Sequence, residues 1–231
     1  YTWGRNAAGQ LGLGDTVNRS SPVQVASQNW SQVAGGDSFN LSTKLDGTMW
    51  SWGRNNGGQL GLNNTAYCSS PVQIGALTTW YQIAAGRAFN LATKTDGTLW
   101  SWGNNSYGEL GLGDAVTRSS PVQVGALTTW SKVAGGGYHS LATKTDGTLW
   151  SWGANSVGQL GLNDIAYRSS PVQIGALTTW SQVASGNTFN LAIKTDGTMW
   201  AWGQNTQGPL GLNDTVFRSS PVQVGALTTW S

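Results

Sequence analysis

Short runs of alternating polar and apolar residues recur along the chain and are separated by glycine-rich turns. In residues 81–130, taken as one specimen, such runs occupy 81–86, 90–94, 98–103 and 120–124. Alternation with a period of two is typical of β-strands. Pro121 lies in the fourth run, where its missing backbone N–H suits an edge strand. The pattern therefore predicts four short antiparallel strands in this stretch.

The second and third runs of the specimen are joined by Asp96-Gly97. Asp-Gly between two strand-like runs favours a two-residue hairpin turn, in which both turn positions adopt positive φ. In the third run, Trp100 and Trp102 are two residues apart, so we expect both indoles on one face of the sheet. Residues of this size are expected to be core residues that fill the space between packed sheets.

The same block returns along the chain with a period of about fifty residues. The copies share Asp-Gly-Thr-(Leu/Met)-Trp-(Ser/Ala)-Trp-Gly, then Gly-x-Leu-Gly-Leu, then Arg-Ser-Ser-Pro-Val-Gln. Its Trp-Gly step begins at Trp3, Trp52, Trp102, Trp152 and Trp202. Tandem repeats of this length, built from short strands, predict an all-β fold: a β-propeller of four-stranded antiparallel blades, with one blade per repeat.

The repeats set the expected domain organisation, a single propeller or propeller fragment over residues 1–231. A half blade in 1–26 precedes four repeats that begin near residues 31, 81, 131 and 181. The chain starts at Tyr1 inside a repeat and stops where another first strand is due, so we expect a segment of a larger propeller. The alternatives are closure by a neighbouring copy and an open arc of blades inside an assembly, because an open sheet edge can pair with another chain.

Composition narrows the function classes. The 231 residues include 33 Gly and 14 Trp but only 10% charged residues, and the formal net charge is +2. The tryptophan content argues against disorder, and the absence of a basic run argues against a nucleic-acid partner. No apolar stretch reaches membrane-spanning length, so membrane insertion is not expected. Cys68 is the single cysteine, which rules out an internal disulfide.

Asp and Arg recur four residues apart before the fourth run of four repeats. The pairs are Asp15/Arg19, Asp114/Arg118, Asp164/Arg168 and Asp214/Arg218. In the second repeat both members change together, to Asn64 and Cys68. Their joint loss indicates that the two side chains contact each other, as a clasp within a loop or as a pair between blades.

One repeat carries the complete motif of a known family. Residues 137–142 read Gly-Tyr-His-Ser-Leu-Ala, 146–148 read Asp-Gly-Thr, 150–153 read Trp-Ser-Trp-Gly, and 155–161 read Asn-Ser-Val-Gly-Gln-Leu-Gly. The chain thereby resembles, over essentially its whole length, the regulator of chromosome condensation family. The resemblance implies a β-propeller, typically of seven blades, that serves as a rigid platform for macromolecular partners.

The chain departs from the family pattern at the histidine, which only His139 keeps. Phenylalanine stands at the equivalent positions 39, 89 and 189, so we interpret His139 as a buried residue at a strand end and not as a base or ligand. The plant UV-B photoreceptors of the family carry Trp and Arg in the preceding loop. No tryptophan occurs there in this chain, so photoreception by that route is not expected.

Positions that differ between otherwise similar repeats are the candidate binding surface. Loops of successive blades gather on one face, where varied side chains on a fixed scaffold form binding sites. The candidate partner-binding residues in the loop before the second run are Asp37, Ser38, Arg87, Ala88, Gly137, Tyr138, Asn187 and Thr188. Arg54 and Tyr107 join them from the segment after Trp-Gly, and residues 16–18, 65–67, 115–117, 165–167 and 215–217 also vary. Neutral drift at exposed positions is the alternative explanation.

No catalytic set, cofactor loop or metal-ligand spacing is present in the sequence, which has one His, one Cys and one Glu. We therefore expect a non-enzymatic scaffold for protein–protein interaction or surface assembly, with another protein or further copies of the chain as partner. The low charge favours an extracellular or surface-exposed setting. One alternative is a multivalent glycan-binding propeller; another is a regulator of nucleotide exchange on a small GTPase.

Overall fold

The structure is a computed structural model that describes residues 1–25 and 29–230, and every regular element in these ranges is a β-strand. They form one two-stranded and four four-stranded sheets. The two-stranded sheet contains β1 (Thr2–Gly4) and β2 (Arg19–Val23). The predicted end of the first half blade, residue 26, lies outside the described residues.

Each four-stranded sheet is built from strands consecutive in the chain. The first contains β3 (Trp30–Gly35), β4 (Phe39–Lys44), β5 (Met49–Gly53) and β6 (Cys68–Gln73). The second contains β7 (Trp80–Ala85), β8 (Phe89–Lys94), β9 (Leu99–Gly103) and β10 (Arg118–Gln123). The third contains β11 (Trp130–Gly135), β12 (His139–Lys144), β13 (Leu149–Gly153) and β14 (Arg168–Gln173). The fourth contains β15 (Trp180–Ser185), β16 (Phe189–Lys194), β17 (Met199–Gly203) and β18 (Arg218–Gln223).

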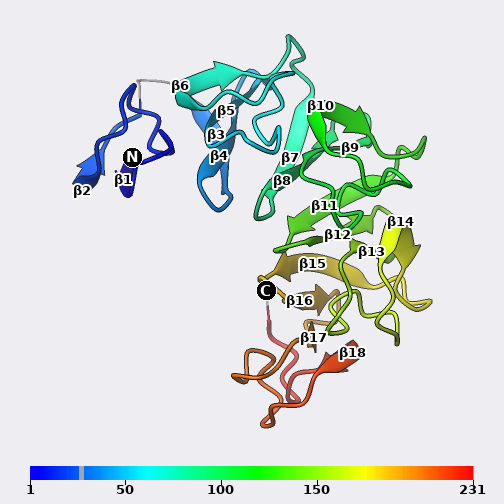
Figure 1. Cartoon of the computed structure of the whole chain (residues 1–231). Coiled ribbons are helices and arrows are strands. Elements are labelled where there is room, and N and C mark those ends of the chain that lie inside the picture. The colour runs from blue at the N-terminus through cyan, green and yellow to red at the C-terminus, as the bar shows by residue number, and fades with distance from the viewer. Residues whose placement is uncertain (26–28, 231) are drawn as a thin grey trace.

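The sheets are arranged as blades around a common centre (Figure 1). Within each blade the strands follow chain order as an antiparallel meander. The first strands of neighbouring blades approach one another, since β7 contacts β3 and β11 contacts both β7 and β15. The fourth strand is the outer edge of its blade, and in β10 Pro121 falls within a register shift of that edge strand. The predicted all-β propeller blades are confirmed.

The Asp-Gly turn differs from the predicted one. In the turn between β8 and β9, only Gly97 has positive φ, at 76°. The Gly97 N–H donates to the Lys94 carbonyl at 2.9 Å, and the Lys94 N–H donates to the Thr98 carbonyl at 3.0 Å. This is a three-residue loop with a left-handed glycine at its end. The predicted positive φ at Asp96 was wrong because its carboxylate instead accepts bonds from the Thr98 N–H at 2.9 Å and hydroxyl at 2.6 Å.

The two tryptophans of each third strand pack at the junction between blades. Trp102 is fully buried, and its indole N–H donates to the Gln59 carbonyl of the preceding blade at 3.1 Å. Trp100 is half-buried, donates to the Thr98 hydroxyl at 2.9 Å, and lies 3.6 Å from the Lys94 ammonium, measured to the ring centroid. Burying one indole contributes on the order of 5 kcal/mol before entropic costs. The prediction that these residues are core is confirmed for the second tryptophan, and the first is only half-buried.

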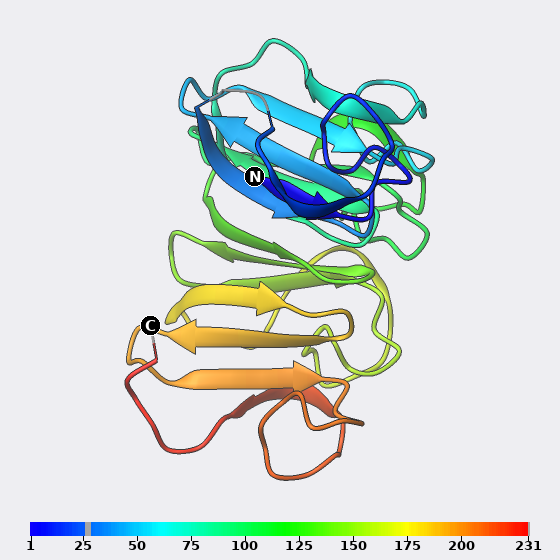
Figure 2. The ribbon, with the colours of Figure 1, turned by 90° about the vertical axis from the view of Figure 1, so that its left-hand side faces the viewer.

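The blades follow one another in chain order from the blue to the red end of the ribbon (Figure 2). Apolar side chains of neighbouring blades form the cores, so each core lies between two blades. One core combines Leu91 and Leu99 of one blade with Trp152 of the next. Close approach at these junctions needs glycine: at Gly61, φ is 69° and an added Cβ would lie 2.8 Å from the Trp102 Nε1. The second glycine of Gly-x-Leu-Gly-Leu is thus fixed by blade packing.

A second hydrogen bond joins each pair of blades and was not anticipated from the sequence. The Asn90 side chain donates to the Gln59 carbonyl at 2.7 Å, so this carbonyl accepts from both Asn90 and Trp102. The equivalent donors are Asn40 to Gln10, Ser140 to Glu109, and Asn190 to Gln159. The three asparagines and Ser140 stand at equivalent positions, so both residue types make the same contact.

Candidate functional site

Two kinds of loop meet at one end of the blades, which we call the loop face. They are the short loops between first and second strands and the long loops between third and fourth strands, which an antiparallel meander places at the same end. The short loops are joined from blade to blade through their backbones. The Asp37 N–H donates to the Arg87 carbonyl at 3.1 Å, the Arg87 N–H to the Gly136 carbonyl at 3.2 Å, and the Gly137 N–H to the Asn187 carbonyl at 2.9 Å. These bonds join backbone atoms only, so the same kind of contact forms although Asp37, Arg87, Gly137 and Asn187 have different side chains.

A buried asparagine organises each long loop. Asn105 is fully buried, donates to the Asp114 and Val116 carbonyls at 3.0 and 3.2 Å, and accepts from the Leu110 N–H at 2.9 Å. The segment after Trp-Gly varies around this fixed asparagine. Asp114 in turn accepts from the Val116 N–H and from Arg118, and these bonds lower the pKa of its carboxyl. These hydrogen bonds hold the backbone of the long loop in place, while its exposed side chains differ from repeat to repeat.

The Asp/Arg pairs form clasps within single long loops. Their N–O distances are 2.5 or 2.6 Å at all four pairs: Arg19–Asp15, Arg118–Asp114, Arg168–Asp164 and Arg218–Asp214. The prediction of mutual contact is confirmed, and the contact is a clasp within a loop. In the second repeat, Asn64 accepts from the Ala66 N–H at 3.0 Å, and the Cys68 thiol lies 3.9 Å from the Ala66 carbonyl.

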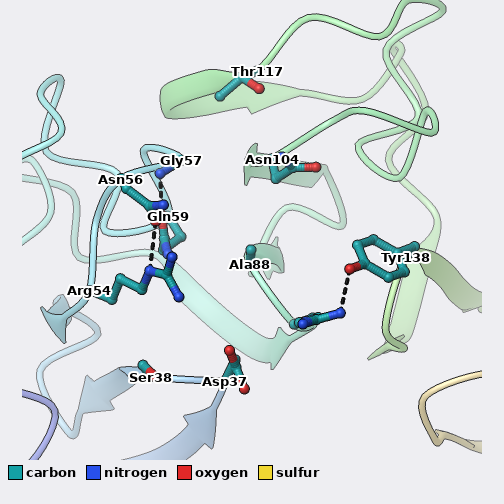
Figure 3. Close-up of a pocket in the computed structure, with 11 residues that line it drawn as sticks. Asp37, Ser38, Arg54, Asn56, Gly57, Gln59, Ala88, Asn104, Thr117 and Tyr138 are labelled. Carbon is teal, nitrogen blue, oxygen red and sulfur yellow. Dashed lines mark hydrogen bonds between the residues drawn. The ribbon is translucent and has the colours of Figure 1, made fainter. Parts of the chain in front are cut away.

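A cavity of about 330 Å³ opens on the loop face between these loops (Figure 3). Six of the predicted partner-binding residues line it: Asp37, Ser38, Arg54, Arg87, Ala88 and Tyr138. They come from three blades. The Arg54 Nε donates to Asn56 at 2.9 Å, and the Arg87 Nη1 donates to the Tyr138 hydroxyl. Both arginines line the cavity, and most of the other lining residues are polar.

An arginine and three tyrosines continue the cavity wall along the loop face. The Arg87 guanidinium carbon lies 5.3 Å from the centroid of the Tyr138 ring. Tyr107 packs edge-on against Tyr138 at 5.1 Å and against Tyr167 at 5.7 Å between ring centroids. Tyr107 and Tyr167 are 40% and 49% exposed, so their rings are available to a partner. We call these four residues the Arg–Tyr cluster; Tyr167 was predicted only as a variable position.

The remaining predicted site residues lie outside the cavity. Gly137 belongs to the backbone contacts between blades, and an added Cβ there would lie 2.2 Å from the Asn187 Oδ1. The Thr188 hydroxyl donates to the Gln204 side chain within its own blade. The structure thus brings together Arg54, Arg87 and Tyr138 with Tyr107 beside them, and does not bring Thr188 to the same place.

Two titratable residues are buried beneath the loop face. His139 is fully buried at the first position of β12, as predicted, and burial lowers its pKa from 6.5 to about 4. Its Nε2 lies 2.8 Å from the Asn190 Oδ1. Glu109 is fully buried, and desolvation raises the pKa of its carboxyl, which accepts from the Tyr107 N–H at 2.7 Å. Neither side chain lines the cavity.

Three further cavities repeat along the rim, between the outer strands of neighbouring blades. Their volumes are about 380, 340 and 350 Å³. The first is lined by Leu77, Trp80, Trp100 and Pro121, among others, and the other two have equivalent linings. Within residues 1–25 and 29–230 no helix is long and apolar enough to cross a membrane. Over the same residues, no group of three or more His, Cys, Asp or Glu side chains is placed to hold a metal ion.

These features define a propeller-type tandem repeat whose blades are joined by Trp, Asn and Gly contacts and whose loops carry a side-chain cluster. The sequence model of the Regulator of chromosome condensation (RCC1) repeat matches residues 1–42, 46–93, 96–143, 146–193 and 196–230. A second model with the same description matches residues 80–109, 130–159 and 180–208. The chain belongs to the RCC1 repeat family. No curated protein matches it in sequence.

Solved structures of RCC1-type propellers share the fold. Human WBSCR16 superposes with a TM-score of 0.84 at 24% identity, over 97% of this chain and 62% of that one. Prp20p from Saccharomyces cerevisiae, in a structure reported with its binding properties to Gsp1p and histones, superposes with a TM-score of 0.81 at 22% identity, over 92% and 55%. The chain thus spans less than two thirds of the length of these relatives.

Proposed function

We propose that the chain is a non-enzymatic scaffold whose loop face binds another protein. The observation that carries this proposal is the Arg–Tyr cluster, which Arg87 and Tyr107 of one blade form with Tyr138 and Tyr167 of the next. Arginine and tyrosine are enriched among residues that dominate the energy of protein interfaces. Neutral drift gives no reason for such residues to meet, whereas these four come from four separate loops and form a continuous series of contacts.

The scaffold beneath the cluster supports the same proposal. Backbone hydrogen bonds hold Arg87 between the neighbouring short loops, and the buried Asn105 fixes the loop that carries Tyr107. A preordered surface loses less conformational entropy when it binds, so more of the contact energy appears as affinity. The structure of Prp20p was reported with its binding properties to Gsp1p and histones, and a protein-binding role for a related propeller supports the proposal.

The test compares the chain with a variant that carries residues from its own other repeats. Tyr107→Gln, Tyr138→Thr and Tyr167→Thr together remove the tyrosines and keep side chains that equivalent loops already tolerate. Tyr67→Thr is the matched control, because Tyr67 is 51% exposed at the position equivalent to Tyr167 but lies outside the cluster.

Proteins from the source organism that bind the chain are identified by mass spectrometry, purified and titrated by calorimetry. We expect the triple variant to bind at least about tenfold more weakly and the Tyr67→Thr control to bind unchanged. Equal affinity of the triple variant and the chain would contradict the proposal. Sedimentation of the chain alone determines whether the partner is a further copy of the chain.

Glycan binding is a second candidate, supported by the repeated rim cavities. Each is lined by a half-buried tryptophan such as Trp100 and is of a size that suits a small ligand. Several equal sites on one chain would raise avidity for a repeating ligand. A glycan array, with tryptophan fluorescence to locate any hit, tests this candidate. Absence of binding at millimolar sugar would exclude it.

Regulation of a small GTPase is a third candidate and rests on the family alone. The test is a nucleotide-exchange assay with a GTPase of the source organism. Nucleotide release at the uncatalysed rate in the presence of excess chain would exclude this candidate, without bearing on the loop-face proposal.

A further inference from the structure

The charges that do not repeat from blade to blade are concentrated on the loop face. Four arginines are paired with aspartates in the clasps. In the part of the chain that the structure describes, three arginines form no ion pair: Arg5, Arg54 and Arg87. Arg54 and Arg87 line the cavity of the loop face, and Arg5 lines a neighbouring cavity of about 310 Å³. Asp37 lines both cavities.

We infer that the cavity between Arg54 and Arg87 receives a carboxylate side chain of an acidic segment of the partner protein. The inference rests on the proposed function and specifies the chemistry of its partner. Arg54 uses its Nε for Asn56, and Arg87 uses one Nη for Tyr138, so each keeps further N–H donors free. Guanidinium groups bind carboxylates through paired, charge-assisted hydrogen bonds.

The arginine donors are held in place before the partner arrives. Both backbone groups of Arg87 bond to neighbouring short loops, and its guanidinium lies against the Tyr138 ring. Asn56 fixes the Arg54 Nε at 2.9 Å. The immobilisation of flexible arginine side chains normally reduces affinity, and here part of that ordering exists in the free chain.

Asp37 selects for the charge of the ligand. With two guanidinium groups and one carboxylate at its wall, the cavity has a small positive excess. A singly charged carboxylate neutralises this excess, while a phosphate, with a charge of about −2, would leave a net negative charge in the cavity and would lose more hydration on entering it. Nucleic-acid binding relies on many cations along a backbone, and this cavity offers two. The geometry therefore favours an acidic peptide over a phosphopeptide or a nucleic acid.

The tyrosines next to the cavity indicate which residue types lie beside the acidic residue in the partner segment. Tyr107 and Tyr167 expose much of their rings and contact each other edge-on. Aromatic rings of this kind pack well against another aromatic or an aliphatic side chain. The partner segment is accordingly an extended stretch in which Asp or Glu lies beside an aromatic or aliphatic residue.

The test measures fluorescence anisotropy with labelled peptides and the unmodified chain. The probes are a peptide that alternates Glu with Phe, its Gln and Lys counterparts, a phosphoserine counterpart, and single-stranded DNA of matching length. We expect the Glu peptide to bind more tightly than all the others and to weaken as salt is raised. Preference for the Lys, phosphoserine or DNA probe, or no binding of any probe, would overturn the inference.

Variants taken from the other repeats assign the binding to the cavity. Arg54→Asn and Arg87→Asn install the residues found at positions 104 and 187, so the fold is expected to tolerate them. Each should weaken binding of the Glu peptide about tenfold, the loss expected for a charged hydrogen bond. Lys132→Gln is the control: it removes the same charge and installs the residue of the other repeats, but lies on β11 away from the cavity.

Asp37→Asn gives an outcome of opposite sign. Removal of this carboxylate should tighten binding of the Glu peptide and reduce discrimination against phosphoserine. If Asp37→Asn weakens binding, or if Lys132→Gln weakens it as much as Arg54→Asn, the carboxylate site is wrong. A protein partner whose affinity falls in the triple tyrosine variant but is unchanged in Arg54→Asn and in Arg87→Asn would be consistent with the proposed function. That result would overturn the carboxylate inference alone.

Discussion

Replacing His139 with phenylalanine should remove a large part of the acid sensitivity of the fold. Asn190 donates to the Gln159 carbonyl at 2.7 Å, which directs its Oδ1 toward His139 Nε2 at 2.8 Å. His139 is therefore neutral with its proton on Nε2, and its buried Nδ1 has no partner. A second proton on Nδ1 would be a buried donor without an acceptor, and this burial lowers the pKa from 6.5 to about 4.

The pKa shift sets the pH window and the size of the effect. Below pH 6.5 the unfolded chain takes up a proton that the folded chain refuses until about pH 4. The free energy of unfolding therefore falls as the pH falls through this window, by about 3 kcal/mol in full and by about 2.5 kcal/mol between pH 8 and pH 4.5. Phenylalanine has no such proton, so His139→Phe eliminates this contribution.

At pH 8 the variant loses the bond to Asn190 but gains apolar burial. An unpaired buried acceptor costs about 1–3 kcal/mol, which the larger apolar ring partly offsets, so we expect the variant to be about 1 kcal/mol less stable. At pH 4.5 it should be about 1.5 kcal/mol more stable than the parent chain. The two stability curves should therefore cross near pH 6, as measured by urea unfolding with tryptophan fluorescence and circular dichroism. A stability difference that is the same at both pH values would refute the reasoning.

The opposite substitution, Phe to His, can be made at the equivalent position one hundred residues earlier in the chain. Phe39 occupies the position equivalent to His139, and the Oδ1 of Asn90, the residue equivalent to Asn190, is buried without a partner. Phe39→His should supply that donor and make the chain more sensitive to acid over the same pH window. If Phe39→His leaves the pH dependence unchanged, the buried imidazole is not its source.

Two further predictions use the repeats as their own controls. Glu109→Gln should raise the free energy of unfolding by about 1–3 kcal/mol at pH 8, because it removes a buried carboxylate with an unpaired oxygen. Since burial raises the pKa of that carboxyl, the gain should shrink as the pH falls toward 4.5. Gln159→Glu, at the equivalent position of the next repeat, should lower the stability by a similar amount at pH 8. Gly111→Ala should destabilise the chain by more than 2 kcal/mol, roughly the cost of strain plus overpacking, because the new Cβ would lie 2.8 Å from the Trp152 Nε1. Gly211→Ala has similar positive φ but no contact below 3.4 Å, so it isolates the strain; equal losses in urea unfolding would refute the junction argument.

The strands and the blades were predictable because each depends on residues close together in the sequence. Alternation located the four strands of each repeat, and Pro121 identified the edge strand. The Asp-Gly turn was predicted incorrectly because the choice between two hairpin types depends on where the Asp96 carboxylate finds donors. Thr98, two residues later, supplies both of them.

The candidate site was only partly predictable because its members come from different blades. The Arg–Tyr cluster combines two loops from each of two neighbouring repeats, and the sequence does not indicate which loops of neighbouring blades touch. Variation between repeats indicated the loops but not the contacts. Tyr167 and Tyr67 are the same residue type at equivalent positions of two repeats, so the sequence cannot distinguish them. Only the structure shows that Tyr167 belongs to the Arg–Tyr cluster.

The backbone contacts of the short loops explain how one scaffold carries different side chains. Asp37, Arg87, Gly137 and Asn187 stand at equivalent positions with unlike charge and size, yet the loops are joined by the same kind of N–H to carbonyl bond. Because the side chains are not needed for that bond, a charged cavity can arise in one part of the loop face without disturbing the next blade. Transfer of Arg54 and Arg87 to the equivalent positions of the following blade, Asn104 and Gly137, should therefore move the carboxylate site along the loop face. The cost in stability should be confined to position 137, where the new Cβ would lie 2.2 Å from the Asn187 Oδ1. A comparable loss of stability from Asn104→Arg alone would show that the side chains do contribute to the blade contacts.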